Sequence, residues 1–283
     1  MDSIAQAISE ATGEVFAVEN IEPISGGCIN EAIKISDSSR TFFVKLNWAD
    51  QLDMFQAEEA GLREMADAGA VRVPQSICSG TANRKAFLVL EYIGLSSMNG
   101  KAEERLGCKL AEMHRTTSEH FGWWRNNTIG ATPQINDPME TWPRFFAEKR
   151  LAFQCQLAEK RGLQLSGWQE LCDRLEGFFG DEKIEASLLH GDLWGGNASM
   201  DEQGNPVIYD PATYYGHRET DLAFTEMFGG FGSKFYATYE EAWPVSQGYS
   251  QRKELYNFYH VLNHYNLFGG SYGSQAVQIL ARL

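Results

Sequence analysis

The chain has 283 residues and a mass of 31.8 kDa, enough for one large domain or two modest ones with a sizeable buried core. With 43% hydrophobic, 12% aromatic and 22% charged residues, the composition is that of a folded globular protein. The 24 Lys and Arg against 38 Asp and Glu give a net charge of −14, which repels phosphate backbones and anionic lipid. We therefore expect neither nucleic acid nor a membrane as a partner.

The first fourteen residues are acidic, with Ile4, Ala7, Ile8 and Ala11 at helical spacing, whereas a signal peptide has a basic start before an apolar run. No stretch approaches the roughly 18 apolar residues of a membrane span. The five cysteines are scattered and lack a CxxC pair, which argues against a disulfide framework or a zinc cluster. These features predict a protein of the reducing cytoplasm.

The next segments predict a hairpin and a third strand. Apolar alternation over residues 15–24 and 28–35, on either side of Ser25-Gly26-Gly27, is typical of two paired strands. Residues 40–46 combine β-branched and aromatic side chains after a polar turn, so a third strand is expected there.

One helix and two more strands are expected before residue 94. Residues 53–68 have apolar side chains at helical period, and Gly69 ends the pattern. Residues 71–77 and 87–93 predict strands, and the second is apolar throughout, as in a strand inside a sheet.

After Ile93 helical spacing predominates, so the larger C-terminal part is expected to be mainly α. The helical segments are residues 103–115, 142–161, 167–179 and 252–268. Between the last two, a short hairpin is expected from residues 198–200 and 206–209 around a polar turn. The chain is therefore predicted to be α+β and bilobal, with a small β-rich lobe over residues 1–92 and a larger α lobe over 93–283, joined by a hinge near residues 91–95.

The segment HGDLWGGN at residues 190–197 indicates chemistry. Four residues separate Asp192 from Asn197, the spacing of kinase catalytic loops, where the Asp takes the proton of the acceptor hydroxyl and the Asn binds Mg²⁺. The hairpin that follows returns the chain so that Asp210 can lie beside Asn197 as a second oxygen ligand for a hard cation. Taken alone, the HGD sequence is as typical of an ordinary turn with a capping aspartate as it is of a kinase catalytic loop.

Kinase chemistry also needs upstream groups, and the first lobe has candidates in order. The turn Gly26-Gly27 fits a phosphate loop, although two glycines also fit an ordinary turn. Lys45 follows an apolar run, where its charge must be paired or must reach solvent. A lysine that binds ATP phosphates and a carboxylate on the next helix would have its charge paired. Glu58 and Glu59 compete for the carboxylate role, and either could simply face solvent.

Residues 88–94, the run LVLEYIG, resemble the strand and hinge between kinase lobes, whose backbone groups contact adenine. A core strand would have the same apolar character. The two interpretations are compatible, because a hinge strand is buried until it leaves the sheet.

Seven segments together resemble the fructosamine/ketosamine kinase family, which belongs to the aminoglycoside-phosphotransferase branch of the kinase-like fold. The most specific are HGDLWGGN and the segment DPATYYGHRETDLA at residues 210–223. The resemblance extends from about residue 3 to the end of the chain. The other segments are SGGCINEA at 25–32, FVK at 43–45, TPQIN at 132–136, WPRFF at 142–146 and NLFGGSYG at 266–273.

The resemblance implies ATP-dependent phosphorylation of the 3-hydroxyl of a ketosamine, the Amadori product of a sugar and an amine. The phosphorylated adduct breaks down spontaneously and frees the amine, so the family is regarded as deglycating proteins or small amines. By position, Asp192 is the base, and Asn197 and Asp210 bind Mg²⁺. The residues implied to bind the nucleotide are Gly26, Gly27, Cys28, Asn30, Lys45, Glu58, Glu91, Tyr92, Ile93 and Gly94.

Further roles implied by the resemblance concern the surroundings of the loop. His190 and Asp221 support the catalytic loop, and His114 matches a structural position of the kinase-like fold. Trp194 is expected either to shape the sugar pocket or to pack against the C-terminal helices.

Two other functions are compatible with parts of the pattern. An aminoglycoside- or choline-type phosphotransferase shares HGD and the metal residues but lacks the full HGDLW-x-GN motif. A non-catalytic nucleotide-binding module is disfavoured because Lys45, Asp192, Asn197 and Asp210 are all present. The sequence leaves open the sugar (fructose, ribulose or erythrulose) and whether the amine is free or part of a protein.

Two features remain outside the main interpretation. Cys28 is either a small residue that fills the turn or a redox-active thiol able to link two chains, so the protein is expected to be a monomer or a redox-dependent homodimer. His260 and His264 are four residues apart, but they lack the Glu of HExxH and a third nearby ligand, which disfavours a metal site.

Overall fold

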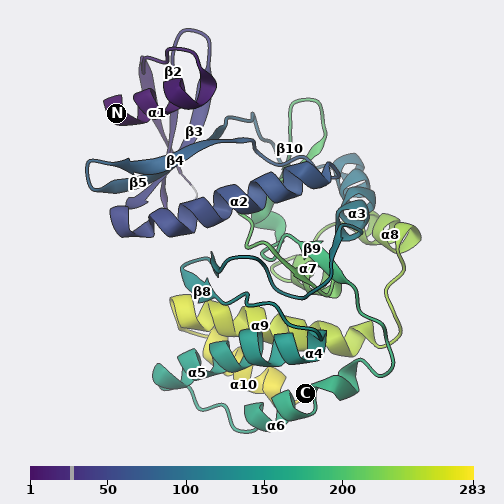
Figure 1. The fold of residues 1–283 in the computed structure, drawn as a ribbon. Helices are drawn as coiled ribbons and strands as arrows, with labels where there is room; N and C mark the ends of the chain where they lie inside the picture. The colour runs from purple at the N-terminus through teal and green to yellow at the C-terminus, as the bar shows by residue number, and fades with distance from the viewer. Residues whose placement is uncertain (26–28) are drawn as a thin grey trace.

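The alternating segments at the start of the chain form an antiparallel sheet with strand order β1-β2-β3-β5-β4. The computed structural model describes residues 1–25 and 29–283. Figure 1 shows this sheet at one end of the molecule and a larger helical part at the other. The strands are β1 Asn20–Ile24, β2 Glu31–Ser36, β3 Thr41–Trp48, β4 Ser76–Ala82 and β5 Lys85–Glu91.

Two helices cover the sheet, and β5 is buried between them. Helix α1 (Asp2–Thr12) packs against β4, and α2 (Leu52–Ala68) packs against β4 and β5. Along β5, Phe87 and Val89 join the apolar cluster of α1, whereas Leu88 and Leu90 join that of α2. Burial on both faces explains why this strand is apolar throughout.

The strand predicted over residues 71–77 is wrong in position. Ser76 begins β4, and the strand continues to Ala82. Pro74 cannot donate a ladder hydrogen bond and restricts the backbone of Val73, so the strand begins after it. Val71 and Val73 are apolar because they are buried in the core beside α2.

The larger part is mainly helical, as predicted, with its longest helix over Tyr249–Phe268. The segment predicted as one helix over residues 142–161 is helical from Trp142 to Lys160, with a π-helical stretch at its centre. No helix within the described residues is long and apolar enough to cross a membrane. The helical elements are α3 Gly100–His114, α4 Trp142–Phe145, η2 Phe146–Ala152, α5 Phe153–Lys160, α6 Trp168–Asp173, η3 Leu175–Phe178, α7 Glu219–Thr225, α8 Ser233–Ala242, α9 Tyr249–Phe268 and α10 Tyr272–Leu280.

Short strands hold the segment of residues 190–197 in place. Strand β9 leads into it and lies between β12 and β6, and the predicted hairpin follows it as β10 and β11, with Ala198 opposite Ile208. A further short hairpin, β7 with β8, was not predicted. The bounds are β6 Thr117–Ser118, β7 Asn127–Ile129, β8 Thr132–Gln134, β9 Ala186–Leu189, β10 Ala198–Met200, β11 Pro206–Ile208 and β12 Tyr214–Gly216.

Helices α3 and α8 pack closely beside the small lobe (Figure 1). Their contact requires a glycine. A Cβ on Gly107 of α3 would lie 2.2 Å from the carbonyl oxygen of Phe235 and 2.3 Å from Thr238 Oγ1, both on α8. The division of the chain at residue 92 stays a prediction.

We predict that Gly107→Ala lowers the free energy of unfolding by about 1–3 kcal/mol, because the added methyl forces α3 and α8 apart. In an unhindered helix interior the same change stabilises by up to about 1 kcal/mol, so the sign is informative. Thermal unfolding checks it, with Gly100→Ala as the control, since a Cβ there meets nothing closer than Lys234 Cδ at 3.6 Å. A melting temperature of Gly107→Ala at or above wild type would contradict the packing.

Candidate active site

The segment of residues 190–197 turns sharply at a glycine. Gly191 has a φ of +80°, and a Cβ on it would lie 2.1 Å from the carbonyl oxygen of Ala212. Both the left-handed backbone and the close approach of the neighbouring chain require glycine here. This turn sets the direction of the chain at the next residue, Asp192, after strand β9 has ended at Leu189.

Asp221 on α7 anchors this turn from beneath. Its Oδ2 accepts the backbone N–H of His190 and its Oδ1 accepts that of Gly191, both at 2.8 Å. His114 at the end of α3 lies 3.1 Å from the same carboxylate through Nε2. All of these contacts are buried, so the backbone of the turn is bonded to a carboxylate that comes from a different element.

His190 itself is a buried side chain with a fixed tautomer. Its Nε2 donates to the carbonyl of Tyr209 at 3.0 Å, and its Nδ1 accepts the backbone N–H of Asp192 at 3.2 Å. Burial lowers the pKa of His190, so the imidazole is neutral at physiological pH. His190 therefore ties the turn to the residue that precedes Asp210.

Asp192 and Asn197 are in direct contact. The amide of Asn197 donates to the Asp192 carbonyl at 2.9 Å and to its Oδ2 at 3.1 Å. Burial, followed by the nearby charge of Asp210, raises the pKa of Asp192 well above its ordinary value, although the Asn197 amide opposes this. The structure thus places two acidic groups and one amide in a single site.

Lys45 on β3 lies between two carboxylates, with Nζ at 2.5 Å from Glu58 Oε1 and at 2.7 Å from Asp210 Oδ1. Burial alone lowers the pKa of Lys45, but these two carboxylates raise it above its ordinary value, so the ammonium remains charged. Glu59 instead bonds Ser79 and Arg63, which decides the choice that the sequence left open.

The backbone of Asp210 is in a conformation uncommon for a residue with a side chain, at a φ of +59°. Its side chain is about half exposed, with a relative accessibility of 48%. The strained backbone directs this carboxylate to Lys45, on a strand 165 residues earlier in the chain. Such strain is typical of functional positions.

Apart from Lys45, Glu58 and Glu91, the predicted nucleotide-binding residues fall into three groups. Gly26, Gly27 and Cys28 lie outside the described residues. Asn30 accepts a hydrogen bond from the Asn47 side chain at 2.7 Å. Tyr92 and the two residues that follow it, Ile93 and Gly94, continue from the end of β5 and are at least partly exposed, and Lys34 lies over the Tyr92 ring.

Glu91 has a partner that sequence reasoning missed. Its carboxylate pairs with Arg72 at 2.6 Å, and Arg72 also pairs with Asp201, whose side chain is 1% exposed, at 2.5 Å. Asp201 belongs to the turn after β10, 129 residues beyond Arg72. Arg72 therefore connects the end of β5 to the hairpin that follows Asn197, a link that no local pattern indicates.

Trp194 lies partly buried between the loop and a C-terminal aromatic group. Its ring packs edge-on against Phe228 at 5.8 Å, and a Cβ on Gly196 would lie 2.3 Å from it. His260 is buried and its ring stacks on that of Phe224 with centroids 3.7 Å apart, and His264 donates through Nδ1 to the His260 carbonyl.

Comparison with known proteins addresses the whole chain at once. The model of the fructosamine kinase family matches residues 1–283. The chain belongs to the fructosamine kinase family. A Synechocystis protein assigned as a ketoamine kinase is 46% identical over 279 residues, which is 98% of this chain and 95% of that protein. The chloroplastic protein-ribulosamine 3-kinase of Oryza sativa subsp. japonica is 39% identical over 95% of this chain and 80% of its own length.

Solved structures agree with the kinase-like fold. A protein of Haemophilus somnus assigned as a fructosamine-3-kinase has a TM-score of 0.93 at 28% identity, covering 99% of this chain and 96% of its own. Choline kinase LicA from Streptococcus pneumoniae, with a TM-score of 0.63 at 16% identity and coverage of 99% and 98%, shares the fold. The predictions of an α+β bilobal kinase-like fold and of an ATP-dependent phosphotransferase in the ketosamine kinase family are confirmed.

We predict that Gly191→Ala lowers kcat/KM of this kinase by about 100-fold, because displacement of a catalytic turn by about 1 Å has effects of this size. Steady-state kinetics with ATP and fructosyl-, ribulosyl- or erythrulosyl-lysine as acceptor measure kcat/KM. Gly204→Ala is the matched control: Gly204 also has a positive φ, +78°, but a Cβ there meets nothing within 4 Å. Equal turnover of the two variants would show that the Gly191 turn does not place Asp192.

Proposed function

We propose that this kinase transfers the γ-phosphoryl group of ATP to the 3-hydroxyl of a ketosamine, with Asp192 as the base. The observation that carries the proposal is the position of the Lys45 ammonium between the carboxylates of Glu58 and Asp210. This arrangement brings a phosphate-binding cation to the same site as Asp192 and Asn197. Its residues occur within a chain that belongs throughout to the fructosamine kinase family.

The donor atoms fit a magnesium nucleotide. Asp210 binds Lys45 through Oδ1, and Asn197 donates its amide N–H to Asp192. Within residues 1–25 and 29–283, Asp210 Oδ2 and Asn197 Oδ1 accept no hydrogen bond. Carboxylate and amide oxygens are ligands that Mg²⁺ accepts, and Lys45 is a partner for phosphate. When bound, the magnesium nucleotide supplies the phosphoryl group and neutralises the charge that develops on it.

This chain's residues then have separate tasks. Asp192 accepts the proton of the acceptor hydroxyl, Lys45 binds phosphate oxygens, and Asp210 and Asn197 hold the metal ion. Glu58 fixes Lys45, and we assign Trp194, in the loop, to contact with the sugar. The same set leaves the identity of the sugar and of the amine to experiment.

An ATP-consumption assay with Mg²⁺ tests the acceptor class. The panel contains fructosyl-, ribulosyl- and erythrulosyl-lysine beside aminoglycosides and choline. Phosphorylation of one or more ketosamines with no turnover of the other acceptors supports the proposal. Turnover of an aminoglycoside or of choline alone would assign the kinase to that alternative class.

We expect Asp192→Asn to lower kcat by about 10²–10⁴-fold, because the amide fits in place of the carboxylate but cannot accept the hydroxyl proton. Affinity for ATP should change little. Steady-state kinetics and nucleotide titration measure the two quantities, and the exposed Asp173→Asn on α6 is the control for loss of a negative charge. If Asp192→Asn retains most of the wild-type turnover, Asp192 is not the base.

The site of phosphorylation determines the fate of the product. A ketosamine phosphorylated on the 3-hydroxyl should decay after the kinase is removed, releasing free amine and inorganic phosphate in step. Amine and phosphate assays over time measure the two releases, with the unphosphorylated ketosamine as the control. A stable phosphoketosamine would refute the 3-hydroxyl as acceptor while leaving kinase activity intact.

A further inference from the structure

A line of buried hydrogen bonds continues beyond Asp221 into helix α8. His114 Nε2 lies 3.1 Å from Asp221 Oδ2, and His114 Nδ1 lies 2.8 Å from the hydroxyl of Tyr239 on α8. Arg218 Nη1 donates to the same hydroxyl at 3.1 Å. All four side chains are more than nine-tenths buried. Arg218 is the N-cap residue of α7, and Asp221 lies in the first turn of the same helix. The series of hydrogen bonds from Asp221 through His114 and Tyr239 to Arg218 therefore starts and ends at the N-terminus of α7.

The direction of each hydrogen bond in this line is determined. Both Asp221 oxygens accept backbone N–H groups, so His114 must donate to Asp221 through Nε2–H. Its Nδ1 then carries no proton and accepts the hydroxyl of Tyr239. The Tyr239 oxygen in turn accepts from Arg218. Burial lowers the pKa of His114 and the charge of Arg218 lowers it further, both of which favour the neutral ring, although Asp221 opposes them.

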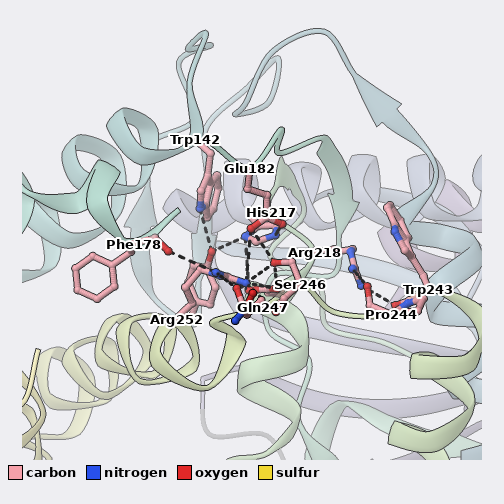
Figure 2. A network of polar contacts seen from close by, with 12 residues as sticks. Trp142, Phe178, Glu182, His217, Arg218, Trp243, Pro244, Ser246, Gln247 and Arg252 are labelled. Carbon is pink, nitrogen blue, oxygen red and sulfur yellow. Dashed lines mark hydrogen bonds and ion pairs between the residues drawn. The ribbon is translucent and has the colours of Figure 1, made fainter. Parts of the chain in front are cut away.

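Arg218 is held in place by neutral oxygens. It also donates to the carbonyls of Trp243 at 3.0 Å and Pro244 at 2.5 Å, and its guanidinium stacks on the Trp243 ring at 4.3 Å, as Figure 2 shows. Within the described residues it forms no ion pair with a carboxylate. A buried cation that donates to a hydroxyl strengthens that hydroxyl as a donor, so Arg218 reinforces the bond from Tyr239 to His114.

We infer that Tyr239 and Arg218 are positioning residues for the catalytic loop of this kinase. They hold His114 in the Nε2–H tautomer and keep its ring aimed at Asp221, which in turn fixes the backbone of His190 and Gly191. This inference rests on the proposed function, because it assigns Asp192 to the chemistry of that loop. It gives helix α8, which begins 36 residues after the loop ends at Asn197, a defined part in the reaction.

A second tyrosine provides a matched control. The hydroxyl of Tyr256 on α9 is also buried and lies 2.6 Å from the Nδ1 of a buried histidine, His217. Figure 2 shows His217 near Glu182 and Arg252, and Arg252 lies 3.7 Å from Glu182. No hydrogen bond in the described residues joins the His217 ring to the backbone of residues 190 and 191. Tyr239→Phe and Tyr256→Phe therefore remove the same kind of contact, but only the first belongs to the line that reaches the loop.

The test compares the two variants by amide hydrogen exchange and by steady-state kinetics. We expect Tyr239→Phe to speed exchange of the His190 and Gly191 amides by about tenfold and to lower kcat by about tenfold, with KM for ATP within twofold of wild type. Tyr256→Phe should leave both amides and kcat as in wild type. A double variant of His114→Gln with Tyr239→Phe should lose no more turnover than His114→Gln alone, because the two changes break the same line.

Three results would overturn the inference. They are equal exchange at residues 190 and 191 in the two tyrosine variants, an unchanged kcat in Tyr239→Phe, and full additivity with His114→Gln. If wild type phosphorylates no ketosamine, the proposed function fails. The exchange rates then still decide whether Tyr239 holds the loop, so the two failures are distinguishable.

Discussion

The buried charge of Lys45 is the constraint on which the arrangement of the site depends. Its side chain is almost enclosed, and an unpaired ammonium in such a place costs several kcal/mol. Helix α2 supplies one carboxylate through Glu58, and the segment after β11 supplies the other through Asp210. The need to pair one charge thus joins the sheet, the helix that covers it and the segment that carries Asp210 in the larger part of the molecule.

A second constraint acts on the loop between β9 and β10. Residues 190–194 have no regular secondary structure, so their backbone groups need partners from elsewhere. Asp221 accepts two of the N–H groups, and His190 uses both ring nitrogens on nearby backbone. The loop is therefore held by side chains behind it, which leaves the Asp192 carboxylate to face the site. Preorganisation of this kind is what an acceptor hydroxyl needs when it is placed for phosphoryl transfer.

The sequence was most informative where the relevant contacts are local. The hairpin between Asn197 and Asp210 could be predicted because its turn chemistry is local. Lys45 could be assigned to a strand, but its choice of Glu58 over Glu59 depends on which face of α2 meets the sheet. Adjacent helix residues point about 100° apart, so both glutamates remained candidates until the packing was known.

Contacts between distant segments could not be predicted. Helix α8 has a mixed polar and aromatic sequence, and its Tyr239 meets His114 from 125 residues away. Arg72 meets Asp201 across a similar separation, and the strand after Pro74 began later than its apolar residues suggested. For Gly26, Gly27 and Cys28 the sequence-based roles remain predictions.

The most direct measurement is a crystal structure with Mg²⁺ and a non-hydrolysable ATP analogue. If Lys45 and Asp210 serve the nucleotide as proposed, Lys45 will contact phosphate oxygens while it remains paired with Glu58, and Asp210 and Asn197 will both bind Mg²⁺. The Asp192 carboxylate will face the terminal phosphate. A nucleotide bound with Lys45 still closed on Asp210 and with Mg²⁺ away from Asn197 would contradict this assignment of the site.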